Sequence, residues 1–255
     1  MKIVFIGAGN LATRLSLEMQ RVGFTIAQIY SRTESSARSL AGQLGCSWTD
    51  RIETVIDDAD VYIFSVKDAV LPRLVSEMKA NGGVWLHTAG SMPLDVFEGK
   101  VARYGVMYPL QTFSKTRPVV FSAIPFFLEA NTVETEFFLQ NIASALSERI
   151  QFLSSDKRKK LHLAAVFACN FTNHIYALSA KLLEEEGIDR NVLLPLIDET
   201  ASKIHTLSPT EAQTGPAVRY DEHVIGTHLA MLQDPDLKAI YRLLSESIHK
   251  EAVNE

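Results

Sequence analysis

KIVFIGAGNLA, at residues 2–12, is a short β-branched run that continues directly into a G-x-G-x-x-A sequence. Leucine, methionine and valine then recur at helical spacing through residues 10–22, and a second apolar run spans residues 25–30. This order of strand, glycine turn, helix and strand predicts a βαβ unit in a parallel sheet that helices cover.

The glycine turn has the small residues that a dinucleotide site requires. Gly7 permits a tight turn, Gly9 lets backbone N–H groups approach a pyrophosphate, and Ala12 lets the helix lie near the strand. The helix N-terminus then offers unpaired donors to phosphates. An ordinary turn can carry the same letters, but a position between a strand and a helix favours nucleotide binding. We therefore expect five residues to contact the nucleotide: Gly7, Ala8, Gly9, Asn10 and Leu11.

The end of the second strand indicates which nucleotide binds. NAD sites usually have an acid here that accepts hydrogen bonds from the ribose 2′-hydroxyl, whereas this chain has Ser31, Arg32 and Thr33. Arg32 can pair with a 2′-phosphate while Ser31 and Thr33 donate hydrogen bonds to it. The sequence predicts NADP, and the alternative is that Arg32 is only a solvated turn residue.

The pattern of the whole chain changes near residue 153. We predict further strands at residues 61–65, 84–87, 105–108 and 125–129, with a weaker one at 46–48. Beyond that point, helices are predicted at residues 156–186, 191–205, 221–232 and 235–250. The fold class is therefore α/β: a Rossmann-type doubly wound parallel sheet in an NADP-binding domain of residues 1–153, followed by an all-α domain of residues 154–255.

Two later strand ends belong to the same predicted cleft, because ligands of such sheets lie beyond the carboxyl ends of the strands. Ser65, Val66 and Lys67 follow one strand, and residues 87–91 follow the next. We expect both segments to line the path from the ribose to the nicotinamide.

The predicted helix at 156–186 carries polar residues on an almost wholly apolar surface. Its apolar composition is typical of a buried helix, within which His162 and Asn170 lie near one another. An unpartnered buried polar group costs about 1–3 kcal/mol, so each has a partner in the core or faces a polar ligand. Residues 108–114 form another polar and aromatic segment, which could also be a plain turn.

Composition excludes several classes of protein. Of the 255 residues, 47% are hydrophobic and 22% charged, which is typical of a packed globule, and the net charge of −5 gives no general attraction to nucleic acids or membranes. The apolar stretch 119–128 is broken and too short to span a membrane, so we expect a cytoplasmic protein. Cys46 and Cys169 give no disulfide framework, and His223 and His228 no metal site.

Several motifs together resemble one family. They are GAGN at 7–10, SRT at 31–33, YPLQTFSK at 108–115, LHLAAVFACNFTNHIYALSAKLL at 161–183, TGPAVRYD at 214–221 and HLAML at 228–232. Over nearly its full length the chain resembles NADP oxidoreductases that join a Rossmann-like domain to a C-terminal helical domain of unassigned function. Its N-terminal half is also similar to pyrroline-5-carboxylate reductase and to the deazaflavin-dependent NADP oxidoreductases. The resemblance implies NADP binding through the glycine turn with Ser31 and Arg32, and a homodimer formed by the helical domain.

More distant relatives, the 3-hydroxyisobutyrate dehydrogenases and ketopantoate reductases, place a catalytic lysine four residues before an asparagine. If Asn170 matches that asparagine, the lysine position is occupied by Val166, so a proton donor must come from elsewhere. His162 is the best substitute, since an imidazole ordinarily has a pKa of about 6.5. Lys159 is less suitable, because residues 158–160 are expected to form a solvated basic cluster.

The sequence thus predicts an NADP-dependent oxidoreductase that reduces a small polar carbonyl or imine substrate, with His162 as proton donor and Asn170 orienting the substrate. One alternative is a ketopantoate-type reductase. Another is a non-catalytic NADP-binding sensor or structural dimer.

Overall fold

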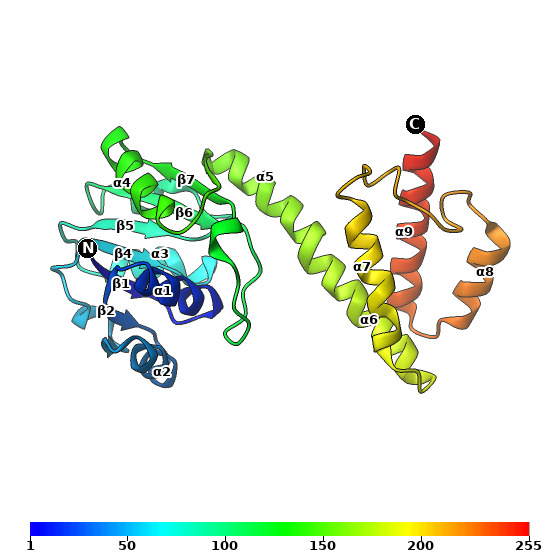
Figure 1. Ribbon diagram of the computed structural model, residues 1–255, viewed down its shortest axis with the longest axis horizontal. Coiled ribbons are helices and arrows are strands. Elements are labelled where there is room, and N and C mark those ends of the chain that lie inside the picture. Colours follow the sequence, from blue (N-terminus) through cyan, green and yellow to red (C-terminus); the bar gives the residue numbers. More distant parts are fainter. Residues whose placement is uncertain (255) are drawn as a thin grey trace. The chain divides into compact units, whose positions relative to one another are not determined.

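The protein, shown as a computed structural model in Figure 1, is described for residues 1–254 and has two compact units, Met1–Asn170 and Phe171–Glu255. The first unit is built on an eight-stranded sheet of order β3-β2-β1-β4-β5-β6-β7-β8. The strands are β1 Lys2–Ile6, β2 Thr25–Tyr30, β3 Ser47–Thr49, β4 Val61–Phe64, β5 Val84–His87, β6 Tyr104–Pro109, β7 Phe126–Ala130 and β8 Ile150–Phe152. Strands β1 to β6 run parallel, and β7 pairs antiparallel with β6 and parallel with β8. The predicted Rossmann-type fold is confirmed.

Both faces of this sheet are covered, which is why its central strands are apolar at nearly every position. Side chains alternate between the faces, so Ile3 and Phe5 belong to one hydrophobic cluster and Val4 and Ile6 to the other. The helices of this unit are α1 Asn10–Arg21, α2 Glu34–Leu44, α3 Leu71–Glu77, α4 Val133–Ser144 and α5 Ser155–Ala165. Because β1 pairs with β2 on one side and β4 on the other, the chain order reverses at β1, where α/β sheets bind ligands.

In the second unit, the described residues 171–254 form helices and no strands (Figure 1). The helices are α6 Thr172–Glu185, α7 Leu194–Lys203, α8 Glu222–Met231 and α9 Pro235–Val253. Asp221 caps α8 by accepting from the Val224 N–H at 3.1 Å, and Asp234 caps α9 by accepting from the Asp236 N–H at 2.9 Å. The predicted all-α C-terminal part is confirmed.

The long helix predicted at 156–186 is divided into α5, a π-helical segment Val166–Phe171, and α6. The compact units separate after Asn170, whereas the sequence placed the domain boundary at 153/154, where its pattern changes. The first turn of α5 is fastened to the sheet by side-chain contacts described below, which accounts for its place in the N-terminal unit.

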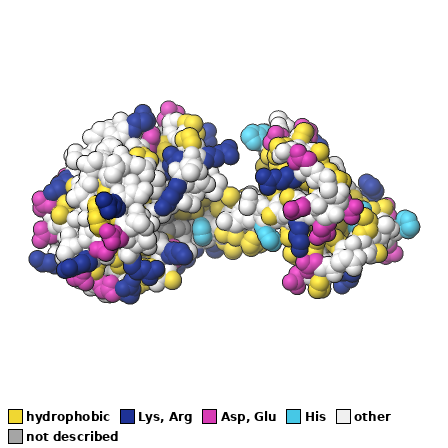
Figure 2. Space-filling view, turned by 90° about the horizontal axis from the view of Figure 1, so that it is seen from below, with side chains coloured by type: hydrophobic (Ala, Val, Ile, Leu, Met, Phe, Trp, Pro, Cys, Tyr) yellow, Lys and Arg dark blue, Asp and Glu magenta, His cyan; other side chains and the backbone are white. Residues whose placement is uncertain are grey.

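The apolar face of this helical run is not buried in the single chain, contrary to the expectation from its composition. The side chains of Leu163 and Phe167 are 59% and 62% exposed. Figure 2 shows hydrophobic side chains, in yellow, at the surface of the segment that leads out of the N-terminal unit. None of the described helices combines the length and the apolar character that a membrane span requires.

Candidate functional site

The glycine turn after β1 has a backbone shape that fits a pyrophosphate. Gly7 has φ +127°, and a Cβ atom at this position would lie 2.2 Å from the carbonyl oxygen of Ser65, so only glycine fits. Gly9 is the N-cap of α1, and no side chain caps this helix. The N–H groups of its first turn are therefore available to an anionic ligand.

A first cavity of about 630 Å³ lies at the carboxyl ends of the parallel strands. All the residues that the sequence predicted for the cofactor line it: Gly7, Ala8, Gly9, Asn10, Leu11, Ser31, Arg32, Thr33, Ser65, Val66 and Lys67. His162, the predicted proton donor, lines it as well. Segments far apart in the chain meet here because parallel strands end at the same edge of the sheet.

The part of this cavity beyond β2 carries positive charge suited to a 2′-phosphate. Arg32 is exposed and makes no ion pair or hydrogen bond with any described residue. Ser31 Oγ accepts a hydrogen bond from the Thr33 N–H at 3.3 Å, which shapes the turn beside it. The sequence missed Arg73 on α3, which also lines the cavity while its guanidinium contacts Glu77 at 2.9 Å. Because Arg73 comes shortly after the strand end at residues 65–67, its position at this cavity could have been predicted from the sequence.

His162 is held at this cavity by Tyr108 and Gly90. Its Nδ1 is 3.0 Å from the Tyr108 hydroxyl, and the two rings are nearly perpendicular. A Cβ atom at Gly90 would lie 2.6 Å from Nδ1, so the loop after β5 can approach the imidazole only because this residue is glycine. Nε2, the other ring nitrogen, makes no hydrogen bond with any residue that the structure describes, so it is available to a ligand.

Tyr108 is a site residue that sequence reasoning did not select. The pKa of its hydroxyl is raised, chiefly by burial, with Asp68 raising it further and Arg158 opposing the shift. The phenol therefore keeps its proton near neutral pH and can donate it to Nδ1 of His162. Its sequence signal was its place at the start of the polar segment 108–114 and near the carboxyl end of β6.

A second cavity, of about 560 Å³, adjoins the first. Four residues line both cavities: Asn10, Leu11, Tyr108 and His162. Asn170 lines the second cavity and not the first, together with Cys169. The structure therefore brings His162 and Asn170 to one cavity, as expected, but only His162 also reaches the predicted cofactor site. Val166, the position of a lysine in distant relatives, is not a wall residue of either cavity.

The π-helical segment explains how two residues eight positions apart line the same cavity. In a regular α-helix of 3.6 residues per turn, such residues point about 80° apart. An i→i+5 segment holds more residues per turn, so each residue turns the chain by a smaller angle. The segment Val166–Phe171 begins after His162 and includes Asn170, so it reduces the angular offset between the two residues. Helical periodicity in the sequence gave no signal for it.

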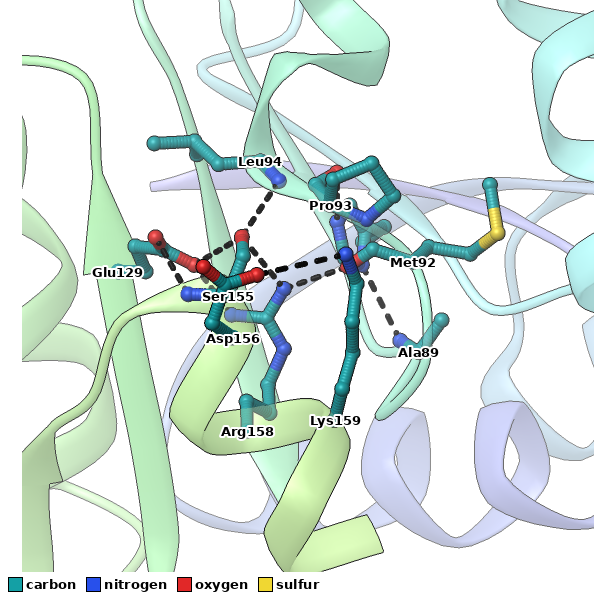
Figure 3. Close-up of polar contacts among 10 residues, drawn as sticks. Ala89, Met92, Pro93, Leu94, Glu129, Ser155, Asp156, Arg158 and Lys159 are labelled. Carbon is teal, nitrogen blue, oxygen red and sulfur yellow. Dashed lines mark hydrogen bonds and ion pairs between the residues drawn. The ribbon is translucent and has the colours of Figure 1, made fainter. Parts of the chain in front are cut away.

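A buried ion pair fixes the start of α5, which carries His162 (Figure 3). Arg158 is fully buried, and its guanidinium donates to the Glu129 carboxylate of β7 and, at 2.5 Å, to the Met92 carbonyl. Ser155 donates to Glu129 at 2.7 Å. The expected solvated basic cluster at 158–160 is therefore wrong for Arg158, whose carboxylate partner comes from a distant strand. Lys159 is exposed and pairs with Asp156 at 3.7 Å.

His87 fixes the loop at residues 89–93, whose Gly90 lies against His162. Its Nδ1 accepts from the Ala89 N–H at 3.2 Å, and its Nε2 lies 3.2 Å from the Pro93 carbonyl. Burial, and secondarily the charge of Arg158, lowers the pKa of His87 from 6.5 to about 3. The ring is therefore neutral, with its proton on Nε2 and donated to Pro93. Arg158 and His87 together hold residues 89–93 against α5.

Comparisons with known proteins agree with this architecture. Residues 2–86 match the family "NADP oxidoreductase coenzyme F420-dependent", and residues 124–248 match "Domain of unknown function (DUF2520)". No curated protein matches the chain. A solved "putative NADP oxidoreductase" from Bacteroides fragilis is 53% identical, with 98% of each chain covered and a TM-score of 0.93.

Two further solved structures share the fold at lower identity. A protein from Thermotoga maritima is 22% identical, with 96% of this chain and 99% of that chain covered and a TM-score of 0.76. The 1-pyrroline-5-carboxylate reductase from Streptococcus pyogenes is 15% identical, with 100% of this chain and 99% of that chain covered and a TM-score of 0.63.

The resemblance inferred from the sequence motifs is confirmed, and so is NADP as the cofactor. Three features of the site fit that nucleotide. They are the N-terminus of α1, which no side chain caps, Gly7, where the fold leaves no room for a Cβ atom, and Arg32, which makes no ion pair with a described residue. The chain belongs to the family of NADP oxidoreductases in which an NADP oxidoreductase domain is followed by the domain of unknown function DUF2520.

Proposed function

We propose that the protein is an NADPH-dependent reductase of a small carbonyl or imine compound, which binds in the second cavity. The observation that carries this proposal is the junction of the two cavities at Asn10, Leu11, Tyr108 and His162. A reductase needs a compound held against its nicotinamide and a proton donor at the same point. The 1-pyrroline-5-carboxylate reductase of the same fold, which is named for a cyclic imine, supports the choice of reaction class.

Each part of the first cavity has a separate task in this proposal. The N–H groups of the turn at residues 7–11 bind the pyrophosphate, and Arg32 binds the 2′-phosphate with Ser31 and Thr33. Bound NADPH supplies a hydride, which carries two electrons to the unsaturated carbon of the substrate. The remaining chemistry belongs to side chains of the second cavity.

His162 supplies the proton. As the C=O or C=N bond takes up the hydride, negative charge develops on its oxygen or nitrogen, and Nε2–H of His162 donates to that atom. The acid is the imidazolium form, in which Nδ1–H donates to the Tyr108 hydroxyl oxygen at 3.0 Å and fixes the orientation of the ring; loss of the Nε2 proton leaves a neutral imidazole. The imidazole then regains a proton from water. Asn170 orients the substrate through its side-chain amide.

The test is NADPH oxidation by the purified protein with a panel of ketones, aldehydes and cyclic imines. For a carbonyl substrate we expect His162→Ala to lower kcat about 100-fold, with a far smaller effect on the Kd for NADPH, which is bound mainly by the turn at residues 7–11 and by Arg32. An imine that is already protonated needs little acid catalysis, so its rate stays nearly intact in the same variant. His174→Ala is the control, because His174 belongs to α6 and lines neither cavity. Tight NADPH binding with no turnover on the whole panel would contradict the proposal and favour a non-catalytic NADP-binding protein.

We also propose that the protein forms a homodimer through its C-terminal helices. Several large apolar side chains of these helices are at least 36% exposed in the single chain: Ile175, Leu182, Leu194, Leu196, Met231 and Leu243. Exposed apolar surface of this kind usually marks an interface.

A further inference from the structure

The walls of the second cavity are mostly apolar. Leu11, Leu110, Phe113, Ala165 and Ala168 contribute hydrocarbon surface from three separate segments of the chain. The polar wall residues include the amides of Gln111 and Asn170 and the two groups at the junction, Tyr108 and His162. An amide can hydrogen-bond a ligand but carries no charge with which to neutralise one.

No lysine, arginine, aspartate or glutamate is found among the described residues that line this cavity. The cationic side chains of the site, Arg32, Lys67, Arg73 and Lys115, line the first cavity instead. Arg14 of α1 is engaged elsewhere, since its guanidinium donates to the carbonyl oxygens of Ser114 at 2.9 Å and Lys115 at 2.5 Å. Positive charge is therefore concentrated where a phosphorylated nucleotide binds and is withheld from the neighbouring cavity.

We infer that the second cavity takes an uncharged ketone or imine with an apolar body, and discriminates against substrates that carry a carboxylate. Moving a carboxylate from water into a site without a cation leaves its charge uncompensated, which is costly. Among the described wall residues only His162 has a side chain that can carry positive charge, and pairing it with a carboxylate would remove it from the reacting atom. An apolar body, in contrast, gains free energy by contact with the leucine, phenylalanine and alanine walls.

This inference rests on the proposed function, because it names the substrate class of the same site. It separates this chain from the fold relative named for 1-pyrroline-5-carboxylate, a substrate that bears a carboxylate. The discriminating feature is the electrostatics of the cavity wall and not the reaction, so binding tests it independently of turnover.

The experiment uses two ketones that differ only in one substituent, 3-methylcyclopentanone and 3-oxocyclopentane-1-carboxylate. Each is titrated into the full-length protein saturated with NADP⁺, which prevents reduction, and its Kd is measured by calorimetry or ligand-observed NMR. We expect the methyl ketone to bind at least about tenfold more tightly than the carboxylate, a difference of about 1.4 kcal/mol. Equal or tighter binding of the carboxylate would overturn the inference, and so would a lack of binding by both ketones.

A gain-of-charge variant makes the test specific to this wall. Gln111 is exposed and lines the second cavity only, so Gln111→Arg adds a cation there with little risk to folding. We expect this variant to bind the carboxylate ketone at least about tenfold more tightly than the unmodified protein does. Gln111→Met, of similar length and without charge, is the matched control and leaves carboxylate binding weak. An unchanged Kd in Gln111→Arg would contradict the placement of the ligand beside this residue.

Turnover separates the inference from the proposed function. The methyl ketone could bind the NADP⁺ complex while the protein reduces neither it nor any related ketone or imine with NADPH. In that case the reductase proposal fails and the assignment of the cavity stands. If carboxylate compounds are the ones reduced, the reductase proposal stands and the inference fails.

Discussion

Arg32 is the residue whose replacement best separates NADP from NAD recognition. We expect Arg32→Ala to raise the Kd for NADPH by about 10- to 100-fold, because a hydrogen bond to a charged group contributes about 1.5–3 kcal/mol. The Kd for NADH, which lacks the 2′-phosphate, stays unchanged. Calorimetry with both nucleotides measures this. Arg38→Ala on α2 removes an exposed arginine that lines neither cavity and serves as the control. An equal loss of affinity for the two nucleotides would show that Arg32 does not contact the phosphate.

His87 gives the protein a pH-dependent stability that can be traced to one side chain. The pKa of His87 is lowered to about 3 by burial and by Arg158, whereas an unfolded histidine titrates near 6.5. Between pH 7 and pH 5 the unfolded chain therefore takes up a proton at this residue and the folded protein does not. The free energy of unfolding falls by about 2 kcal/mol over this range on account of His87 alone. The fall continues until the folded form also protonates, near pH 3.

Urea unfolding of the unmodified protein and of His87→Gln at pH 7 and pH 5 tests this expectation. The glutamine amide can replace both contacts of the imidazole ring but does not titrate. The variant should lose about 2 kcal/mol less than the unmodified protein between the two pH values. The same pH dependence in both proteins would mean that folding does not lower the pKa of His87.

Residues at strand ends were open to prediction because one rule places them. Each cofactor residue predicted from the sequence lies at the first cavity, since the carboxyl ends of parallel strands meet there. Tyr108 also lies near the carboxyl end of a parallel strand, β6, but this rule does not identify its role. Its importance depends on a hydrogen bond to His162, a residue 54 positions away, and no local pattern encodes that contact.

Helix α5 depends on Arg158 both for its attachment and for the placement of His162, one turn further along. Removing one partner of a buried ion pair typically costs about 3–5 kcal/mol, because the other charge remains buried and unpaired. We expect Arg158→Met to destabilise the protein by about that amount, measured by urea unfolding. In combination with Glu129→Gln, which removes the orphaned charge, part of the stability returns. Lys160→Met, at an exposed position of the same helix, is the control.

The kcat of the double variant shows whether Arg158 positions the groups around His162 or only stabilises the fold. Because the guanidinium also holds the Met92 carbonyl, the double variant lets the loop beside His162 move, so kcat falls while the Kd for NADPH stays nearly constant. A double variant with normal kcat would show that the ion pair only stabilises the fold.

Strands and helices with a strong period were predicted to within a few residues, and the exceptions have physical causes. Strand β8, Ile150–Phe152, was missed because it is short and mostly exposed, so it has no apolar run. The π-helical segment Val166–Phe171 has a hydrogen-bond pattern that apolar spacing does not reveal. Arg158 sits in a basic run typical of a solvated surface, and its partner Glu129 lies 29 positions away.

For the molecule as a whole, the proposed homodimer makes a direct prediction. Light scattering coupled to size-exclusion chromatography should give twice the mass of the 255-residue chain at micromolar concentration. Leu243→Glu on α9, where the side chain is 65% exposed, should shift the protein towards the monomer, because burying an unpaired charge opposes association. Lys250→Glu changes an exposed position of the same helix and should leave the mass unchanged. A monomer in the unmodified protein would contradict the proposal.

Composition alone could not settle where the apolar helical surface goes. The sequence predicts that Leu163 and Phe167 are buried, but it does not say whether they are buried within one chain or between two chains, because both kinds of burial require apolar side chains. In the structure both side chains are exposed in the single chain, so they are not part of its core.

The residues common to the two cavities, Asn10, Leu11, Tyr108 and His162, have a thermodynamic consequence. In the proposed complex each bound molecule contacts side chains that its neighbour also contacts, so filling one cavity alters the free energy of filling the other. Linkage requires this cooperativity to be reciprocal: whatever factor the nucleotide imposes on ketone affinity, the ketone imposes on the nucleotide.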